Sequence, residues 1–171
     1  MTGTVGELQF ARVAQDDALA APLLAELAVE YSQRYGGPLS AHLAALHDFP
    51  ASEFAPPHGG LLIGVIGGVP VTGGAFRRFD DDTAELKRIW TDGNHRRRGH
   101  AKAMLAELEC DIARSGYRRI YLMTGDRQPE AERLYESAGY TRLDKPLPSA
   151  GPVYPVAFGK ILVANRDVGA S

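Results

Sequence analysis

The sequence predicts an α/β fold, with a mixed and mostly antiparallel sheet of about seven strands and with helices that flank it. Two observations predict this class. Residues 61–91 contain three apolar runs joined by short turns, which is the pattern of an antiparallel meander. Residues 84–124 then read as strand, amphipathic helix and strand, a unit that pairs its two strands in parallel through the crossover helix.

The first part of the chain predicts one strand, two helices and a loop. Apolar side chains alternate weakly over residues 7–13, which indicates a short first strand. Apolar residues at helical spacing indicate a helix that begins after Asp17 and runs to Tyr35, where Gly-Gly-Pro ends it. Ser40 is placed to cap a short second helix. Prolines, glycine and aromatic residues then predict a surface loop over residues 48–60.

The central meander consists of apolar strands over residues 61–66, 71–79 and 84–91. A Gly-Gly pair at residues 67–68 joins the first two strands, because glycine accepts the positive φ angles of a tight hairpin turn. Consecutive aspartates at residues 80–82 form the exposed second turn. The sequence therefore predicts two hairpins in succession.

The second half of the chain predicts two helices, each followed by strand. An apolar face at helical spacing indicates an amphipathic helix over residues 99–115, and residues 119–124 supply the strand after it. Proline suits the first turn of a further helix over residues 129–139, which a glycine ends. Residues 140–143 and 156–163 are expected to form the last two strands.

Composition favours one globular domain, residues 1–171 with a core over residues 7–163. The chain is 44% apolar and 23% charged, and its net charge of −2 is not that of a general polyanion binder. No long apolar run and no secretory pattern is present, so we expect no membrane span and a cytoplasmic location. The lone Cys110 fits a reducing compartment, and its position inside a helix favours a buried small hydrophobe over a nucleophile.

An arginine-rich loop, TDGNHRRRGHAK over residues 91–102, lies between the third meander strand and the next helix. The start of a helix offers unpaired N–H groups and a partial positive charge, which suit an anion such as phosphate. Gly99 lets a ligand approach the backbone closely because it has no side chain. The loop lacks the Gly-Lys-Ser/Thr ending of a P-loop and the three glycines of a dinucleotide-binding turn. It therefore predicts a pyrophosphate site of a third kind.

Two segments, ELKRIWTDGNHRRRGHAKAMLAELE and RRIYLMTGDRQPEAERLYESAGY, resemble the N-acetyltransferases of the GNAT superfamily. That family carries Arg/Gln-x-x-Gly-x-Gly/Ala at its acetyl-CoA site, and Arg96-Arg97-Arg98-Gly99-His100-Ala101 matches the motif. The runs GGVPVTGGAFRRF and VAFGKIL also look like strands of the family. The resemblance implies a GNAT fold whose central strands splay apart to admit the arm of acetyl-CoA.

The resemblance also implies that acetyl-CoA is the co-substrate and that the backbone amides of the arginine loop hold its pyrophosphate. The residues implied to contact acetyl-CoA are Ile89, Trp90, Thr91, Arg96, Arg97, Arg98, Gly99, His100, Ala101, Lys102 and Gln128. Gln128 stands nearest the position where the family often has an asparagine that contacts the pantetheine arm. No metal site is expected, since the histidines beside the arginines have no partners at ligand spacing.

Two residues match positions that transfer protons in the family. Tyr135, in LYESAGY, matches a tyrosine that protonates the leaving thiolate, and a phenol with a pKa of about 10 can donate to a thiolate as it forms. The alternative for Tyr135 is a core aromatic residue. Glu85 matches a glutamate that accepts a proton from the attacking amine, directly or through water. The alternative for Glu85 is an exposed charge that pairs across the sheet beside Lys87 and Arg88.

The resemblance therefore implies transfer of an acetyl group from acetyl-CoA to a primary amine by direct attack, with a small-molecule acceptor favoured. A protein N-terminal or lysine acetyltransferase and a non-catalytic acyl-CoA-binding sensor or interaction domain stay open. A nucleic-acid-binding protein that uses the arginines is a further alternative, against which the acidic net charge argues. No nucleic-acid or membrane partner is expected, and homodimers are frequent in the family. Residues 31–60 and 143–155 would select the acceptor, and they contain no motif that identifies it.

Overall fold

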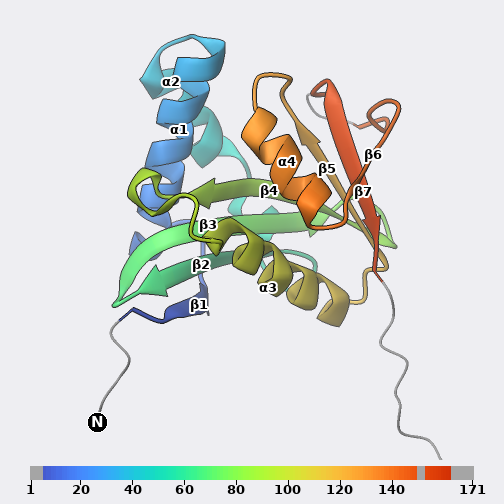
Figure 1. Cartoon of the computed structure of the whole chain (residues 1–171), viewed down its shortest axis with the longest axis horizontal. Helices are drawn as coiled ribbons and strands as arrows, with labels where there is room; N and C mark the ends of the chain where they lie inside the picture. Colours follow the sequence, from blue (N-terminus) through green and yellow to red (C-terminus); the bar gives the residue numbers. More distant parts are fainter. Residues whose placement is uncertain (1–5, 150–152, 163–171) are drawn as a thin grey trace, which may run out of the picture.

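The computed structural model describes residues 6–149 and 153–162 of the 171-residue chain (Figure 1). Within this part, a seven-stranded sheet has the order β1-β2-β3-β4-β5-β7-β6. The strands are β1 (Leu8–Arg12), β2 (Gly60–Ile66), β3 (Val69–Arg78), β4 (Thr83–Thr91), β5 (Arg119–Thr124), β6 (Thr141–Arg142) and β7 (Val156–Ile161). The helices are α1 (Ala21–Tyr35), α2 (Leu39–Asp48), α3 (His100–Arg114) and α4 (Pro129–Ser137), with 3-10 turns η1 (Ala18–Ala20), η2 (Ala51–Phe54) and η3 (Gly93–His95). The predicted α/β class with a mixed sheet is confirmed.

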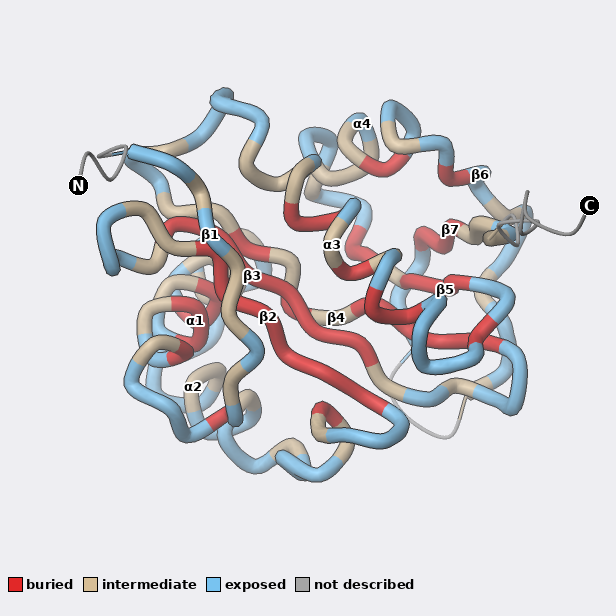
Figure 2. The backbone as a smooth tube through the Cα atoms, turned by 90° about the horizontal axis from the view of Figure 1, so that it is seen from below, coloured by how far each residue is buried: buried red, intermediate tan, exposed pale blue. Residues whose placement is uncertain are grey.

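Two layers of helices enclose the sheet (Figure 2). Helices α1 and α2 pack on one face around buried side chains that include Leu23, Leu27 and Trp90. Helices α3 and α4 pack on the other face around a second cluster, in which Leu105 and Phe158 are fully buried. Helices α1, α3 and α4 therefore bury apolar side chains and leave their polar side in water, as the helical spacing predicts, whereas α2 has no buried residue and packs mainly on α1.

The sheet is divided between β4 and β5. Strands β1 to β4 form an antiparallel meander, and β5, β7 and β6 pair antiparallel with one another. The two halves meet in the parallel pairing of β4 with β5, which within the described residues extends only from Thr83 to Glu85 on β4. Beyond Glu85, β4 continues to Thr91 without β5 beside it, while β5 stays paired with β7 as far as Thr124. The central strands are therefore splayed, as expected.

Several element boundaries differ from the prediction. Asp17 does not start α1 but caps η1, because its carboxylate accepts a hydrogen bond from the backbone N–H of Leu19 at 2.9 Å. Helix α2 begins one residue before Ser40, so Ser40 lies inside the first turn and Pro38 takes the capping position. The loop predicted over residues 48–60 contains η2. The end of the strand predicted over residues 156–163 lies outside the described residues.

The expectation for Cys110 was wrong, since Cys110 is exposed on α3. The buried positions of α3 are Met104, Leu105, Leu108, Asp111 and Ile112, and residue 110 falls on the opposite side of the helix. In the part of the chain that the structure describes, no helix has the length and apolar character needed to cross a membrane.

Candidate functional site

A β-bulge bends β4 where it leaves β5. Gly73 on β3 pairs with Trp90 and Ala75 pairs with Lys87, so β4 carries one extra residue over this stretch. Within it, Arg88 has a φ of 61°, a left-handed conformation that is uncommon for a residue with a side chain. Residues 84–91 are predicted as a regular strand, since nothing in their pattern signals a bulge.

The side chain of Arg88 is buried and holds the bulge in place. Its guanidinium donates to the Gln15 side-chain oxygen and to the Leu46 carbonyl, both at 2.6 Å. It also stacks over the Phe54 ring, 4.7 Å from the centroid. Burial lowers the pKa of Arg88 to about 10, and Tyr31 opposes this shift. These contacts hold the bulge against the end of α2, on the face of the sheet that α1 and α2 cover.

The loop after β4 leads into the N-terminus of α3. Asp92 caps η3 and accepts a hydrogen bond from the Asn94 N–H, while His95 Nδ1 lies 2.6 Å from the Asp92 carboxylate. Arg97 and Gly99 then adopt left-handed φ angles of 64° and 79°. This sequence of turns brings the chain abruptly from the strand into the helix.

Gly99 occupies the N-cap position of α3 with an open space beside it. A Cβ atom at Gly99 would meet no atom within 4 Å. The N–H groups of the first helical turn have no carbonyl partners within the helix, and the helix dipole adds partial positive charge there. Arg96, Arg97 and Arg98 are exposed around this turn. The predicted anion site therefore has the open backbone, the free donors and the charge that a pyrophosphate needs.

His100 contributes a buried polar atom without a partner. Among the described residues, its Nε2 is the buried side-chain nitrogen or oxygen for which no hydrogen bond is formed. Burial lowers the pKa of His100, and the neighbouring His95 and Arg98 lower it further. A neutral imidazole at the first residue of α3, with a nitrogen left free, is an arrangement that a bound ligand can complete.

Tyr135 is buried on α4, among Tyr140 and Phe158, with ring centroids 5.8 and 5.7 Å away. Burial raises the pKa of Tyr135, and the nearby Tyr31 phenol raises it further. The phenol is therefore protonated at neutral pH. Tyr31 comes from α1, on the other face of the sheet from α4, so the two phenols interact from opposite faces. Both readings of Tyr135, core aromatic and proton donor, are compatible with this position.

Glu85 is the last residue of β4 that pairs with β5, and it is 2% exposed. Arg77, directly opposite on β3, donates to its carboxylate at 3.1 Å, and the Lys87 ammonium lies 3.8 Å away. Arg77 also binds Glu53 at 3.0 Å. The alternative reading of Glu85 was right about pairing across the sheet but wrong about exposure. The role of Glu85 as a base stays a prediction.

The other β4 residues point to both faces of the sheet. Trp90 is buried against α1, and its indole N–H donates to the Glu26 carboxylate. Ile89 packs on the opposite face, in the cluster of α3 and α4. The Thr91 hydroxyl lies 3.3 Å from that of Thr72. Contact of these three residues with acetyl-CoA stays a prediction.

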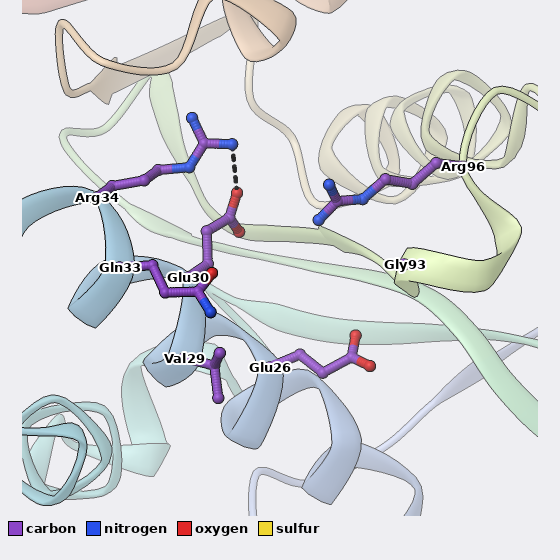
Figure 3. Close-up of a pocket in the computed structure, with 7 residues that line it drawn as sticks. All are labelled: Glu26, Val29, Glu30, Gln33, Arg34, Gly93 and Arg96. Atoms are coloured by element: carbon purple, nitrogen blue, oxygen red, sulfur yellow. Dashed lines mark ion pairs between the residues drawn. The ribbon is translucent and has the colours of Figure 1, made fainter.

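A cavity of about 250 Å³ lies between α1 and the loop that follows β4. Figure 3 shows Arg96 reaching from the loop towards α1, where Glu30 pairs with Arg34. The lining residues are Glu26, Val29, Glu30, Gln33, Arg34, Gly93 and Arg96. Only Arg96 among them is predicted from the sequence as a site residue, because a polar stripe on a helix does not reveal which loop it faces.

Comparison with known proteins identifies the fold. The sequence model of the acetyltransferase (GNAT) family matches residues 23–140. The chain belongs to the GNAT family. The match includes the splayed strands, the arginine loop and Tyr135, and it ends at Tyr140, which follows α4.

Two curated N-acetyltransferases are similar to parts of this GNAT chain. Human N-acetyltransferase 8 is 31% identical over 81 residues, which are 47% of this chain and 34% of that protein. An uncharacterized N-acetyltransferase of Bacillus subtilis, YsnE, is 35% identical over 69 residues, 39% of this chain and 46% of that protein. The chain thus matches less than half the length of either relative.

Solved structures share the GNAT fold over almost the whole chain. An acetyltransferase of the GNAT family from Staphylococcus aureus superposes with a TM-score of 0.76 at 15% identity, covering 92% of this chain and 100% of that one. An acetyltransferase from Thermus thermophilus superposes with a TM-score of 0.69 at 18% identity, covering 92% and 99%. At these identities the likeness shows the fold.

Proposed function

We propose that this GNAT protein is an N-acetyltransferase that moves an acetyl group from acetyl-CoA to a small-molecule primary amine by direct attack. One observation carries the proposal. The open N-terminus of α3, with Gly99 at its cap, directly follows the strand that has parted from β5. An anion site therefore adjoins a split in the sheet, which suits a ligand with a charged end and an extended arm.

The residues at the start of α3 would hold the charged end of the donor. The N–H groups of His100, Ala101 and Lys102 are free of helical partners, and Arg97 and Arg98 add positive charge beside them. The GNAT family model that the chain matches supports acyl-CoA as the ligand class. Acetyl-CoA, when bound, would supply the activated thioester carbonyl.

Tyr135 would donate a proton to the leaving thiolate. The raised pKa keeps its hydroxyl protonated across the neutral range, as an acid catalyst requires. Its place on α4, within electrostatic reach of Tyr31 from α1, supports this role.

Glu85 would accept the proton that the attacking ammonium must lose. Its carboxylate lies where β4 and β5 begin to part, held at a fixed place by Arg77. A base that is fixed by a neighbouring cation can act through an intervening water, which is the form of the role that burial favours.

Titration calorimetry tests the donor, and thiol release tests the reaction. The proposal predicts that acetyl-CoA binds and that free thiol appears only when a primary amine is added. A non-catalytic acyl-CoA sensor would instead bind acetyl-CoA and release no thiol with any amine. A protein acetyltransferase would release thiol with a peptide and not with small amines, which makes a mixed acceptor panel the informative design.

A further inference from the structure

The last turn of α1 is tied to the segment between β5 and α4 by a reciprocal set of contacts. Arg34 donates to the Arg127 carbonyl at 2.6 Å and pairs with Glu130, and Arg127 donates back to the Arg34 carbonyl at 3.0 Å. Gln128 donates its side-chain N–H to the Tyr35 hydroxyl at 3.0 Å. We call these five residues the α1–α4 latch.

The latch spans the open end of the split. Helix α1 packs on the half of the sheet that β1 to β4 form, whereas residues 125–130 follow the last residue of β5, Thr124. The two halves pair at the other end, over Thr83 to Glu85 of β4. The latch is therefore a second bridge between the halves, placed where the strands have parted.

Tyr35 occupies the surface that a ligand in the split would need. Its hydroxyl lies so close to the buried Gly125 that a side chain at this glycine would collide with it. A glycine at the end of a strand allows a ligand to approach the backbone closely. Here the tip of Tyr35 fills that place and holds the side-chain amide of Gln128.

The cavity beside the latch has no excess of charge. Its wall contains the carboxylates of Glu26 and Glu30 and the guanidinium groups of Arg34 and Arg96, with Val29 between them (Figure 3). The charges offset one another, so the cavity suits a neutral, amide-bearing chain better than a polyphosphate. Arg34 belongs both to this wall and to the latch.

We propose that the α1–α4 latch competes with the neutral arm of the acyl-CoA for Gln128 and for the surface of Gly125, so that Tyr35 limits ligand affinity. The inference rests on the proposed function, because it takes an acyl-CoA as the ligand. When the arm binds, Gln128 exchanges the Tyr35 hydroxyl for an amide oxygen of the arm. Part of the binding free energy is then spent on breaking the latch, as for any ligand that binds a minor conformation.

Tyr35→Phe tests this by titration calorimetry with acetyl-CoA. Loss of one competing hydrogen bond should lower the dissociation constant of acetyl-CoA by about two- to tenfold. Ser115→Ala, which removes one hydroxyl and its hydrogen bond to the Asp111 carbonyl at the C-terminal end of α3, should leave it unchanged. In a Gln128→Ala background, Tyr35→Phe should have a smaller effect, since the shared partner is gone and only the surface of Gly125 is released.

Each other outcome has a defined meaning. Structural damage to α1 would weaken acetyl-CoA binding, so it cannot imitate the predicted gain in affinity. Unchanged or weaker affinity of Tyr35→Phe would contradict the proposed competition. An equal gain with and without Gln128 also overturns it. Failure of the wild-type protein to bind acetyl-CoA would contradict both the proposed function and the competition. If the wild type binds acetyl-CoA and Tyr35→Phe binds it with the same affinity, only the competition is contradicted.

Discussion

Tyr135 combines a proposed catalytic hydroxyl with a ring that packs in the core. Its ring fills the core between Tyr140 and Phe158, so Tyr135→Phe keeps the packing and removes only the hydroxyl. We expect turnover to fall by about 10²-fold or more, because a general acid contributes on that scale, while the dissociation constant of acetyl-CoA stays the same. Steady-state kinetics and calorimetry measure the two quantities. If turnover of Tyr135→Phe is unchanged across the pH range, the role of Tyr135 is purely structural.

Glu85 allows a matched comparison with Glu53, because both carboxylates bind the Arg77 guanidinium. Glu85→Gln should abolish the limb of the pH–rate profile in which turnover rises as the base loses its proton. Glu53→Gln disturbs the same arginine and should keep that limb. If both variants retain it, Glu85 is a structural partner of Arg77 and not the base.

His100 gives a prediction about stability and pH. Since burial lowers its pKa in the folded state, the unfolded chain binds more protons between that lowered pKa and the ordinary value of about 6.5. Stability therefore rises with pH across this window and falls as the pH drops through it. Thermal unfolding of wild type and His100→Gln from about pH 5 to about pH 8 should show a shallower pH dependence for the variant. Parallel curves would show that His100 does not titrate differently on folding.

Residue identity alone predicted the candidate roles but not the surroundings. The motif positions of Tyr135 and Glu85 can be read from the sequence, and Glu85 lies where β4 and β5 part. The Arg77 partner of Glu85 depends on the register of β3 against β4, and the exposure of Cys110 depends on which side of α3 meets the sheet. The register cannot be derived from spacing along one segment, whereas the exposure of Cys110 could have been, because residue 110 lies opposite the apolar face of α3.

At the scale of single elements, α3 offers an internal control for its own N-terminus. Gly99 precedes the helix and Gly116 follows it, with φ of 79° and 95° and with no atom within 4 Å of a Cβ at either position. Valine at either site should therefore cost about 1–3 kcal/mol of stability through backbone strain. Calorimetry should show that only Gly99→Val loses acetyl-CoA binding. Equal binding of acetyl-CoA by both variants would show that the N-terminus of α3 does not contact the ligand.

The elements themselves were largely predictable, since amphipathic helices and glycine turns carry strong local signals. The irregular ones were not. The β4 bulge at Arg88 is held by Gln15 and Leu46, contacts from distant parts of the chain that override local preference. The α1–α4 latch joins residues 34–35 to residues 127–130, a relation that only the folded chain creates.

For the whole molecule, the division of the sheet is the feature that connects fold with proposed activity. Two half-sheets are joined over a short parallel pairing, and the arginine-rich loop follows β4 after that strand has parted from β5. The family resemblance predicted this splay, and the structure confirms it. The acceptor is not predictable, because the segments that would contact it follow no shared motif.

Coupled product analysis tests the central claim of direct acetyl transfer most directly. Protein, acetyl-CoA and a panel of primary amines are combined, and free thiol and acetylated amine are quantified together by a thiol reagent and mass spectrometry. Direct transfer predicts one thiol for each acetylated amine, no acetyl group left on the protein, and a fall of both products by about 10²-fold or more in Tyr135→Phe. Binding of acetyl-CoA without thiol release for any amine or peptide, or an acetylated protein intermediate, would contradict it.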